Sequence, residues 1–557
     1  MVVIAAAAFL ALGLLHFDFS ANWWRGQSVR LVLGIPLCLL YAYVVMPPLV
    51  FPQAITLLLL TLVPNVGLTI AEAARKIVVS RRIVSIRRTP ILPPLIAVGI
   101  VLVYAGVLTA LPVVDASGLR DITGVTTTSE KPPAADLQHV RVVPQESAEF
   151  SGSKVLGQLG AYYRVGDYNV QSENGKLVWV APLDFQGAVQ WLVRGTSPGV
   201  IVVSAENPDA PAELRQRQPL RYIPSALLNT NLMRHVYMSY GTELLLETTL
   251  QLDAAGDPKY IVTLGRPTIG WSGETVTAVV IVDPASGAMQ RIPREQFPSL
   301  PAWISRVYPA DLALEYNDWL GRYVHGWWNA VVTKRDVHLP VRDEVFGLLL
   351  DANRFVWFAD HTSPNATDDS MTGFTYMDSR SGAMVYYTSA GGEFNSVAAE
   401  RSVSANPIIT QGRLIPTQPI LYNIGGQNTW VVPAVASNGK FQTLALVQAA
   451  GGHVVVGNSS STAPVADAFA QYRAFLGGSN ENAGAETTLS GTIDRFIATG
   501  SRILFTIRGR QEIFTIADPS VPAVLLARPG DNVRFTATAP QDGTSLVREF
   551  HDRTLGQ

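Results

Sequence analysis

Residues Thr277 to Met289 read TAVVIVDPASGAM, and about 95 residues later Thr372 to Met384 read TGFTYMDSRSGAM. Both stretches place an alternating apolar run before the pattern Asp-x-x-x-Gly. In a hairpin, Asp opens such a turn and Gly takes the positive φ that is needed to leave it. The two stretches therefore predict one strand-and-turn unit that the chain uses twice.

Each copy also follows an aromatic, β-branched stretch that predicts a partner strand, Tyr260 to Leu264 in one case and Phe355 to Ala359 in the other. Weaker versions of the same pair flank them. Upstream, Leu177 to Pro182 precedes Gly199 to Ala210, and downstream, Thr429 to Pro433 precedes Leu444 to Val456. The pattern predicts an α+β fold with four tandem modules of helix plus antiparallel sheet, at residues 149–244, 245–340, 341–410 and 411–478.

The composition divides the chain into two parts. Overall 48% of residues are hydrophobic and the mean hydropathy is +0.20, which is high for a soluble protein. Residues 1–114 hold eight Lys or Arg and two Asp or Glu, so the rest holds 34 basic and 42 acidic residues. A net-acidic large domain argues against nucleic acid as a partner. Cys38 is the only cysteine, which excludes an intramolecular disulfide and a Cys-based metal cluster.

Four apolar runs predict a membrane domain of about four transmembrane helices over residues 1–114. The runs are Met1 to His16, Leu31 to Met46, Leu49 to Ile70 and Ile91 to Val114. A hydrocarbon core of ~30 Å needs about 20 helical residues, so the last two runs are long enough and the first two are slightly short. Membrane lipid is therefore an expected partner.

A basic loop precedes the last of these runs. It contains Arg75, Lys76, Arg81, Arg82, Arg87 and Arg88. The positive-inside rule places this loop in the cytoplasm and everything after about residue 115 outside it. A large exported domain without cysteine suggests the cytoplasmic membrane of a bacterium. The loop either recognises anionic lipid or a cytoplasmic partner, or acts only as a topology signal, and the second interpretation is favoured.

Residues 115–148 are rich in Asp, Thr, Ser and Pro and predict a linker. After residue 488, five short stretches predict a small β-barrel at 488–557. They are Leu489 to Ala498, Arg502 to Arg508, Glu512 to Ala517, Val521 to Leu526 and Asn532 to Thr538. Their rhythm resembles an OB-fold, a barrel that often binds oligonucleotides or oligosaccharides. With eight Arg and seven acidic residues, this barrel lacks the basic groove for single strands, so a protein contact is expected.

An amphipathic helix is predicted after Pro309. One face carries Leu312, Tyr316, Trp319, Leu320, Tyr323 and Trp327 at helical spacing. The aromatic residues suggest a ligand or partner face made of Trp319, Tyr323, His325, Trp327 and Trp328. Packing against a neighbouring sheet is the favoured interpretation, because large aromatic side chains usually fill cores.

A polar loop at residues 360–369 is dense in oxygen donors. Asp360, Asn365, Asp368 and Asp369 are weak candidates for Ca²⁺ ligands. Their spacing matches no EF-hand, and the same residue types are what a solvated hairpin loop requires. No metal or cofactor is predicted. A P-loop, an HExxH zinc motif and a Cys nucleophile outside the membrane part are absent from the sequence, so an enzyme is not favoured.

The hairpin motif YIVTLGRP followed by TAVVIVDPASGAM resembles the PepSY-type module, a cystatin-like unit of helix plus sheet. The resemblance covers the two central modules and implies that Asp283, Gly287, Asp378 and Gly382 are fold residues. It also implies a role in binding or regulating peptidases or in envelope assembly, with other envelope proteins or a second copy as partners. The leading hypothesis is a membrane-anchored envelope scaffold. The alternatives are an envelope enzyme or peptidase regulator acting on peptide or glycan, and a subunit of a transport or secretion complex.

Overall fold

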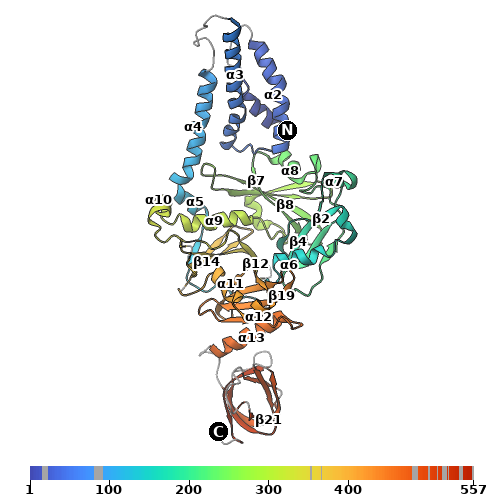
Figure 1. The fold of residues 1–557 in the computed structure, drawn as a ribbon, viewed down its shortest axis with the longest axis vertical. Coiled ribbons are helices and arrows are strands. Elements are labelled where there is room, and N and C mark those ends of the chain that lie inside the picture. The colour runs from blue at the N-terminus through green and yellow to red at the C-terminus, as the bar shows by residue number, and fades with distance from the viewer. Residues whose placement is uncertain are drawn as a thin grey trace.

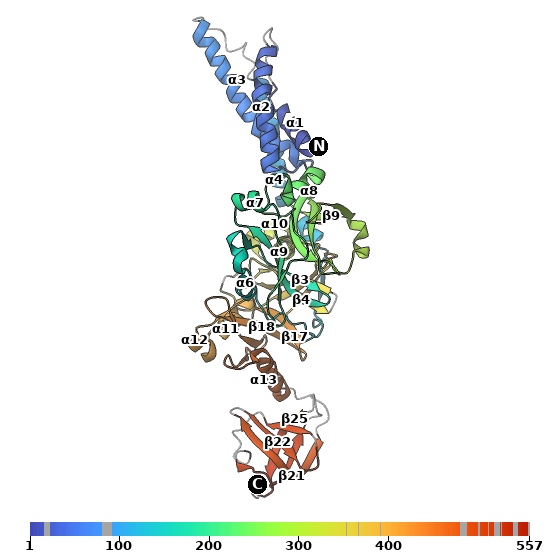
Figure 2. The ribbon, with the colours of Figure 1, turned by 90° about the vertical axis from the view of Figure 1, so that its right-hand side faces the viewer.

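The computed structural model describes residues 1–15, 23–80, 92–351, 354–365, 367–389, 391–479, 487–499, 502–510, 512–516, 524, 526–537 and 544–554. The molecule is elongated. A group of N-terminal helices lies at one end, a set of β-sheets forms the middle, and a small barrel at the C-terminus lies at the other end (Figure 1; Figure 2). The fold is mixed α+β, as the sequence predicts.

Three helical segments are long and apolar enough to cross a membrane: Gly26–Val45, Gln53–Glu72 and Leu92–Val114. They belong to α2 (Trp23–Val45), to η1 (Gln53–Leu58) with α3 (Leu59–Ser80), and to α4 (Leu92–Val114). The first predicted span is instead α1 (Val2–Leu12), whose 11 residues rise only about 16 Å, half of a hydrocarbon core. The described residues therefore contain three candidate spans rather than four.

A polar cluster joins α1, α2 and α3. The Arg30 guanidinium donates to Glu72 Oε2 at 3.0 Å and to Thr69 Oγ1 at 3.2 Å. Asn65 Nδ2 donates to the carbonyl oxygens of Gly13 and Leu15, at 2.9 and 2.8 Å, beyond the end of α1. These bonds hold the short first helix beside the bundle. Of the predicted basic loop, Arg75 and Lys76 fall within α3, and Arg81, Arg82, Arg87 and Arg88 lie outside the described residues.

The middle of the molecule contains four antiparallel sheets, numbered here in chain order. Sheet 1 has β3 (Asn169–Glu173), β4 (Lys176–Phe185), β5 (Val200–Ser204) and β6 (Glu213–Arg215), with β2 (Tyr163–Val165) also on β4. Sheet 2 has β7 (Leu244–Leu252), β8 (Pro258–Arg266), β9 (Thr275–Val282) and β10 (Met289–Pro293). Sheet 3 has β12 (Phe346–Asp351), β13 (Arg354–Thr362), β14 (Gly373–Asp378) and β15 (Met384–Thr388), with β1 (Thr126–Thr128) and β11 (Leu339–Pro340) at its edges. Sheet 4 has β17 (Ile420–Ile424), β18 (Gln427–Val435), β19 (Phe441–Gln448) and β20 (Val454–Val456), with β16 (Ile415–Pro416) on β18.

Helices connect and cover the sheets. They are α5 (Ala116–Ile122), α6 (Gln145–Ser153), η3 (Gly157–Ala161), α7 (Ala188–Arg194), η4 (Leu228–Thr230), α8 (Leu232–Tyr240), η5 (Arg294–Ser299), α9 (Ala310–Arg322), α10 (Gly326–Trp328), η6 (Asn329–Thr333), α11 (Ser396–Ser404), α12 (Pro407–Gly412) and α13 (Pro464–Ser479). The α9 helix has buried residues along its length and packs against sheet 3, whereas α13 contacts sheet 4.

The repeated motif of residues 277–289 and 372–384 forms the same turn in two sheets. Asp283 Oδ1 accepts the backbone N–H of Ser286 at 2.9 Å, and Asp378 Oδ1 accepts that of Ser381 at 2.8 Å. The glycine of each turn has a φ near 77°, Gly287 at 77° and Gly382 at 78°. A Cβ at Gly382 would come within 2.4 Å of the Tyr308 ring, so only glycine fits there.

Corresponding contacts recur in three of the sheets. The indole N–H of Trp179 donates to the Val143 carbonyl, that of Trp357 to Tyr308, and that of Trp430 to Phe394, each at 2.9 Å. Each tryptophan lies on the second strand of its meander, and each acceptor belongs to the segment that precedes that sheet along the chain. These three sheets are therefore each bonded to the chain that precedes them in the same way.

The first strands of the meanders face one another. Gln171 of β3 bonds the carbonyl of Leu250 and the N–H of Leu252, both at 3.1 Å and both on β7. The buried Arg141 donates to Gly347 O on β12 at 3.1 Å and lies 4.8 Å from the Trp179 ring centroid. These contacts join sheet 1 and the chain before it to sheets 2 and 3.

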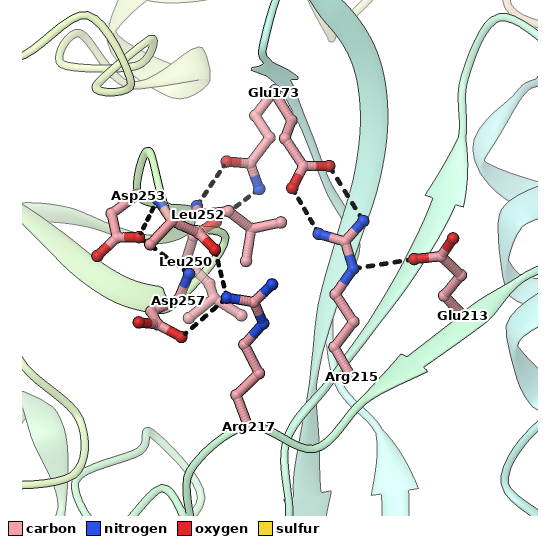
Figure 3. A network of polar contacts seen from close by, with 10 residues as sticks. Glu173, Glu213, Arg215, Arg217, Leu250, Leu252, Asp253 and Asp257 are labelled. Carbon is pink, nitrogen blue, oxygen red and sulfur yellow. Dashed lines mark hydrogen bonds and ion pairs between the residues drawn. The ribbon is translucent and has the colours of Figure 1, made fainter.

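Ion pairs stabilise sheet 1 and add to its contact with sheet 2. Figure 3 shows the Arg215 guanidinium between Glu173 and Glu213, and Arg217 reaching the β7–β8 turn. Arg215 Nη1 lies 2.5 Å from Glu173 Oε1, whereas Arg217 Nη1 lies 3.6 Å from Asp257 Oδ1. The first pair joins the β3–β4 hairpin to the edge strand β6, and the second joins the chain after β6 to sheet 2.

Segment 115–148, predicted to be a linker, is an ordered part of the fold. After α5 it forms β1, which pairs in parallel with β15, Thr126 opposite Val385. Further on, the Ala135 N–H donates to the Asn423 carbonyl at 2.8 Å, and Val140, Val142 and Val143 lie in the core shared with sheets 3 and 4. The polar composition of this segment is typical of a linker. Its contacts could not be predicted from the sequence, because most of its partners lie more than 200 residues away.

The C-terminal part is a closed barrel with strand order β21-β22-β23-β25-β24. Its strands are β21 (Thr487–Thr499), β22 (Arg502–Ile507), β23 (Ile513–Ile516), β24 (Asn532–Ala537) and β25 (Thr544–Asp552). Four predicted strands correspond to β21–β24. The fifth, Val521 to Leu526, lies mostly outside the described residues, and its described positions 524 and 526 are helical. The strand that completes the barrel is β25, which the sequence analysis missed.

Candidate functional site

The outer surface of β21, β22 and β23 is the candidate site. In β22, Ile503, Phe505 and Ile507 face the barrel core, so the residues between them face outward. The strand registers place Ile497 opposite Leu504, and Leu504 opposite Thr515. Two residues further along β22, Thr506 lies opposite Arg495 on one side and opposite Ile513 on the other. We call this set the barrel face: Arg495, Ile497, Leu504, Thr506, Ile513 and Thr515.

The barrel face presents aliphatic side chains to solvent. Ile497 is 56% exposed and Ile513 is 42% exposed, and Leu504 lies between their strands, half-buried. Ile497 lies opposite Leu504, and Ile513 lies diagonally across from Leu504 on the next strand, so the three side chains form one small apolar patch. Such a surface suits another protein, because aliphatic residues at the centre of an interface exclude water and contribute most of its apolar contact.

Ion pairs border the barrel face. Arg508 Nε lies 4.0 Å from Asp494 Oδ1, and Arg510 Nη1 lies 3.8 Å from Glu512 Oε2. Both cations follow β22, and each has a carboxylate neighbour. The rim is thus polar with balanced charge. It differs from the uniformly basic groove of a barrel that binds single-stranded nucleic acid, and it is more typical of a protein contact.

The predicted aromatic face is divided by the structure. Trp319 lies in the core beside Tyr316, with ring centroids 5.4 Å apart, and Tyr323 packs at the edge of that core. Because α9 ends at Arg322, the other aromatic residues are not on it. Trp327 and Trp328 are 37% and 66% exposed, and His325 Nε2 lies 3.0 Å from the exposed Asp336. The first part is therefore core, and the second part is a separate exposed surface.

The four candidate Ca²⁺ ligands do not converge. Asp360 is buried and accepts the Ser396 N–H at 2.7 Å, at the start of α11. Asp368 accepts the Ser370 N–H at 2.9 Å, and Asp369 pairs with Arg401 at 2.7 Å. Asn365 holds its own turn by accepting the Thr367 N–H at 3.2 Å. Within the described residues, no group of three or more His, Cys, Asp or Glu is placed to hold a metal ion.

Two histidines form a buried pair that could not be predicted from the sequence, because they are 23 residues apart. His338 Nδ1 lies 2.9 Å from His361 Nδ1, and His361 Nε2 lies 2.9 Å from Asn317 Oδ1 on α9. Tyr386 stacks on His338 with ring centroids 4.7 Å apart. Burial lowers the pKa of His338 to about 4 and holds the pKa of His361 well below its usual range, so both rings are neutral at pH 7. The pair joins α9 to sheet 3.

A GxSxG elbow is not expected from the sequence, yet Gly195 to Gly199 read GTSPG and match that pattern. In a hydrolase elbow the serine follows a strand, precedes a helix and is exposed. Here Ser197 follows the helix α7, precedes the strand β5 and is 0% exposed. Its backbone N–H and carbonyl both pair with Leu220 at 2.8 Å. The serine is a structural residue of sheet 1.

Comparisons with known proteins leave the chain without a family. No family model and no curated protein matches it. Two of the solved structures found are cobalt-substituted Synechocystis ACO and an ACO/RPE65 chimera, each with 8% sequence identity and a TM-score of 0.14. They cover 55% and 54% of this chain, which spans about half of their length, 49% and 48%. At that TM-score the likeness carries no argument about fold or function.

Proposed function

We propose that the protein is a membrane-anchored envelope scaffold that presents its C-terminal barrel to a partner protein. One observation carries the proposal: the candidate spans and the closed barrel lie at opposite ends of an elongated molecule, with the four sheets between them (Figure 1). A rigid spacer that separates an anchor from a terminal binding surface serves recognition at a distance from the bilayer.

The barrel topology supports this role. In the order β21-β22-β23-β25-β24, the pair β23–β25 is parallel and the other neighbours are antiparallel. We propose that this barrel is an OB-fold, a class whose ligands bind across the second and third strands. The barrel face lies on those strands and on the first. The PepSY-like resemblance of residues 260–289 adds to the proposal, since such modules are associated with binding and regulation.

We also propose that the sheets and the barrel are outside the cytoplasm of a bacterium. The proposal is supported by the basic residues that precede α4, because the positive-inside rule directs the end of that helix outward. Alkaline phosphatase fused after residue 479 should be active, since it matures only outside the cytoplasm, whereas a fusion after Ser80 should be inactive. The reverse pattern would show the opposite orientation.

Partner binding is tested with the full-length protein after gentle detergent extraction. We expect a defined complex by size measurement and mass spectrometry. Placing a carboxylate on the barrel face, with Ile497→Glu and Leu504→Glu together, should remove the partner because a charge would be buried in the contact. The matched control is Leu526→Glu, at a 59% exposed apolar residue of the same barrel outside the barrel face.

The results separate the alternatives. Loss of the partner with the double variant and its retention with the control would support the barrel face as the binding site. If the double variant keeps its partner, the site lies elsewhere. If the extracted protein is a bare monomer, the scaffold proposal is wrong.

A further inference from the structure

Apolar side chains are exposed in groups at the end of the sheet region from which the candidate spans emerge. Along the long axis of the molecule, α7, α8 and α10 all lie at that end (Figure 1; Figure 2). Isolated exposed apolar residues are ordinary on any protein surface, but groups at helical spacing are not. Two such groups are present, on α7 and on α10 with η6, and a single exposed tryptophan, Trp271, lies beside α4.

The first group is on α7. Val189, Leu192 and Val193 are 67%, 71% and 66% exposed, and their spacing puts them on one side of the helix. On the other side, Trp191 packs against the core of sheet 1. The helix is thus amphipathic, with its apolar side turned away from the protein. Arg194 is an exposed cation at the end of α7, and its guanidinium carbon lies 3.8 Å from the Tyr162 ring centroid.

The second group is on α10 and η6. Trp327, Trp328, Val331 and Val332 are 37%, 66%, 52% and 53% exposed. Lys334 and Arg335 follow directly and are exposed. Arg335 also lies 3.4 Å from Asp336, so part of its charge is balanced. Exposed tryptophans, aliphatic residues and adjacent cations are the composition of a segment that lies in a membrane interface.

A single tryptophan indicates the depth of this surface relative to the bilayer. Trp271, on the loop between β8 and β9, donates its indole N–H to Thr109 Oγ1 of α4 at 3.1 Å. Thr109 precedes the end of α4 by five residues, which is about 7 Å of helix rise. Trp271 therefore lies level with the last turns of a candidate span, at the depth where tryptophan is enriched in membrane proteins.

Other bonds hold the sheet region against the ends of the spans. The Leu49 N–H donates to the Gly241 carbonyl at 2.8 Å, and Tyr237 Oη donates to the Pro47 carbonyl at 2.7 Å. Arg234 Nε donates to the Tyr43 carbonyl at 3.0 Å. These bonds fix α8 to the spans, and α10 contacts α5, the helix that follows α4. Because α7 lies at a similar height along the long axis of the molecule (Figure 1), all three helices have a set position relative to the bilayer.

We propose that the sheet region rests on the same bilayer that the spans cross, with α7 on one side and α10–η6 on the other inserted into the lipid interface. The occupant of these surfaces is phospholipid: acyl chains and glycerol backbone against the aliphatic and indole groups, and headgroup phosphates beside Arg194, Lys334 and Arg335. This contact with the bilayer fixes the direction in which the distal barrel points. The proposal does not depend on what the barrel binds.

The test uses the full-length protein in phosphatidylcholine–phosphatidylglycerol vesicles. In a Cys38→Ala background, single cysteines at Leu192 and at Trp328 are labelled with an environment-sensitive fluorophore. Lipids with a nitroxide at carbon 5 of the acyl chain report contact with the upper acyl region. The matched control is Ile415→Cys, a 51% exposed apolar position of β16 on sheet 4, far from the spans.

The expected result is quenching at positions 192 and 328 that is several-fold stronger than at position 415, together with protection of both from aqueous iodide. Equal lipid quenching at all three positions would overturn the proposal. Quenching at only one of positions 192 and 328 would overturn a contact with two sides and indicate a tilted domain. All three positions are exposed, so labelling should leave the fold unchanged, which the same thermal transition in each variant would confirm.

Discussion

The repeated turns show how one side chain stabilises a hairpin. Both Asp283 and Asp378 accept backbone N–H groups within their turns, but only in the first turn does the structure place a lysine, Lys259, on the carboxylate. Burial raises the pKa of Asp283, whereas the hydrogen bonds from Lys259 and Ser286 lower it, to about 2 overall. The ionised form is thus favoured in the folded protein.

Substituting Asp283→Asn should lower the free energy of unfolding at pH 7 by about 1 kcal/mol, because the pKa falls from 3.8 in the unfolded chain to about 2 and solvent screening reduces the effect of this partly exposed ion pair. The stabilisation is complete above pH 4 and is lost as the pH falls from about 4 to 2, so the variant should be less acid-sensitive over that range. Urea unfolding at several pH values measures this. Asp378→Asn is the control for the backbone bonds alone, and an equal loss in both variants would show that Lys259 contributes nothing.

The His338–His361 pair should also make the folded protein less stable at low pH, although the folded state here favours the neutral form of the side chain and not the charged form. Burial lowers the pKa of His338 to about 4, so between pH 6.5 and 4 the unfolded chain binds a proton that the folded chain does not. His338 alone should therefore lower stability by ~1.4 kcal/mol for each pH unit below about 6.5, and His361, whose pKa burial also lowers, should add to that slope. The variant His338→Asn should be less stable at pH 8 yet show a flatter profile down to pH 4.5. His325→Asn, at an exposed position, should keep the slope of the wild type.

At the residue scale, the turns could be predicted from their own residues, whereas side-chain contacts between segments far apart in the sequence could not. The motif Asp-x-x-x-Gly identifies the turns at residues 283–287 and 378–382, because a turn needs only its own residues. The pair His338–His361, the acceptors of Trp179 and Trp357, and the burial of Ser197 depend on segments brought together only by folding. One sequence carries no record of those distances.

At the scale of elements, the aromatic residues predicted for one face of α9 are divided between the core and the surface. Trp319 is 7% exposed in the core, whereas Trp328, beyond the end of the helix, is 66% exposed. Trp319→Ala should cost ~3–5 kcal/mol of stability, since it leaves a large cavity. Trp328→Ala should change stability by less than ~0.5 kcal/mol. Thermal unfolding in detergent micelles measures both, and similar losses would contradict this division.

The elements that were predicted well are those with strong periodicity. The strand pairs of all four sheets were recognised from alternating apolar runs, and α9 was recognised from its 3.6-residue period. The first predicted span and the segment 115–148 were misjudged for opposite reasons. In the first, hydropathy alone did not show that the helix stops at Leu12. In the second, polar composition concealed β1 and the buried valines around Arg141.

On the scale of the whole molecule, the barrel has a core of its own. Its buried residues, among them Phe505, Phe514 and Phe535, form a cluster that shares no member with the two cores of the sheets. Deleting residues 488–557 should therefore leave the main thermal transition of the protein within a degree or two, and calorimetry of the intact chain should show a separate smaller transition. A large drop in the main transition on deletion would show that the barrel supports the sheets.

The parallel pairing of β1 with β15 has a mechanical consequence. The chain leaves α4, passes through α5 and β1, and is then bonded to sheet 4, where Asn423 Nδ2 donates to the Pro132 carbonyl at 2.7 Å. Tension applied between the distal barrel and the bilayer enters sheet 4 through α13 and has a direct route to α4 along residues 123–135. Sheets 1 and 2 are attached to the spans separately, through the bonds of Tyr237 and Gly241 to Pro47 and Leu49. A pull on a captured partner would therefore load the strap formed by residues 123–135 before it loads sheets 1 and 2.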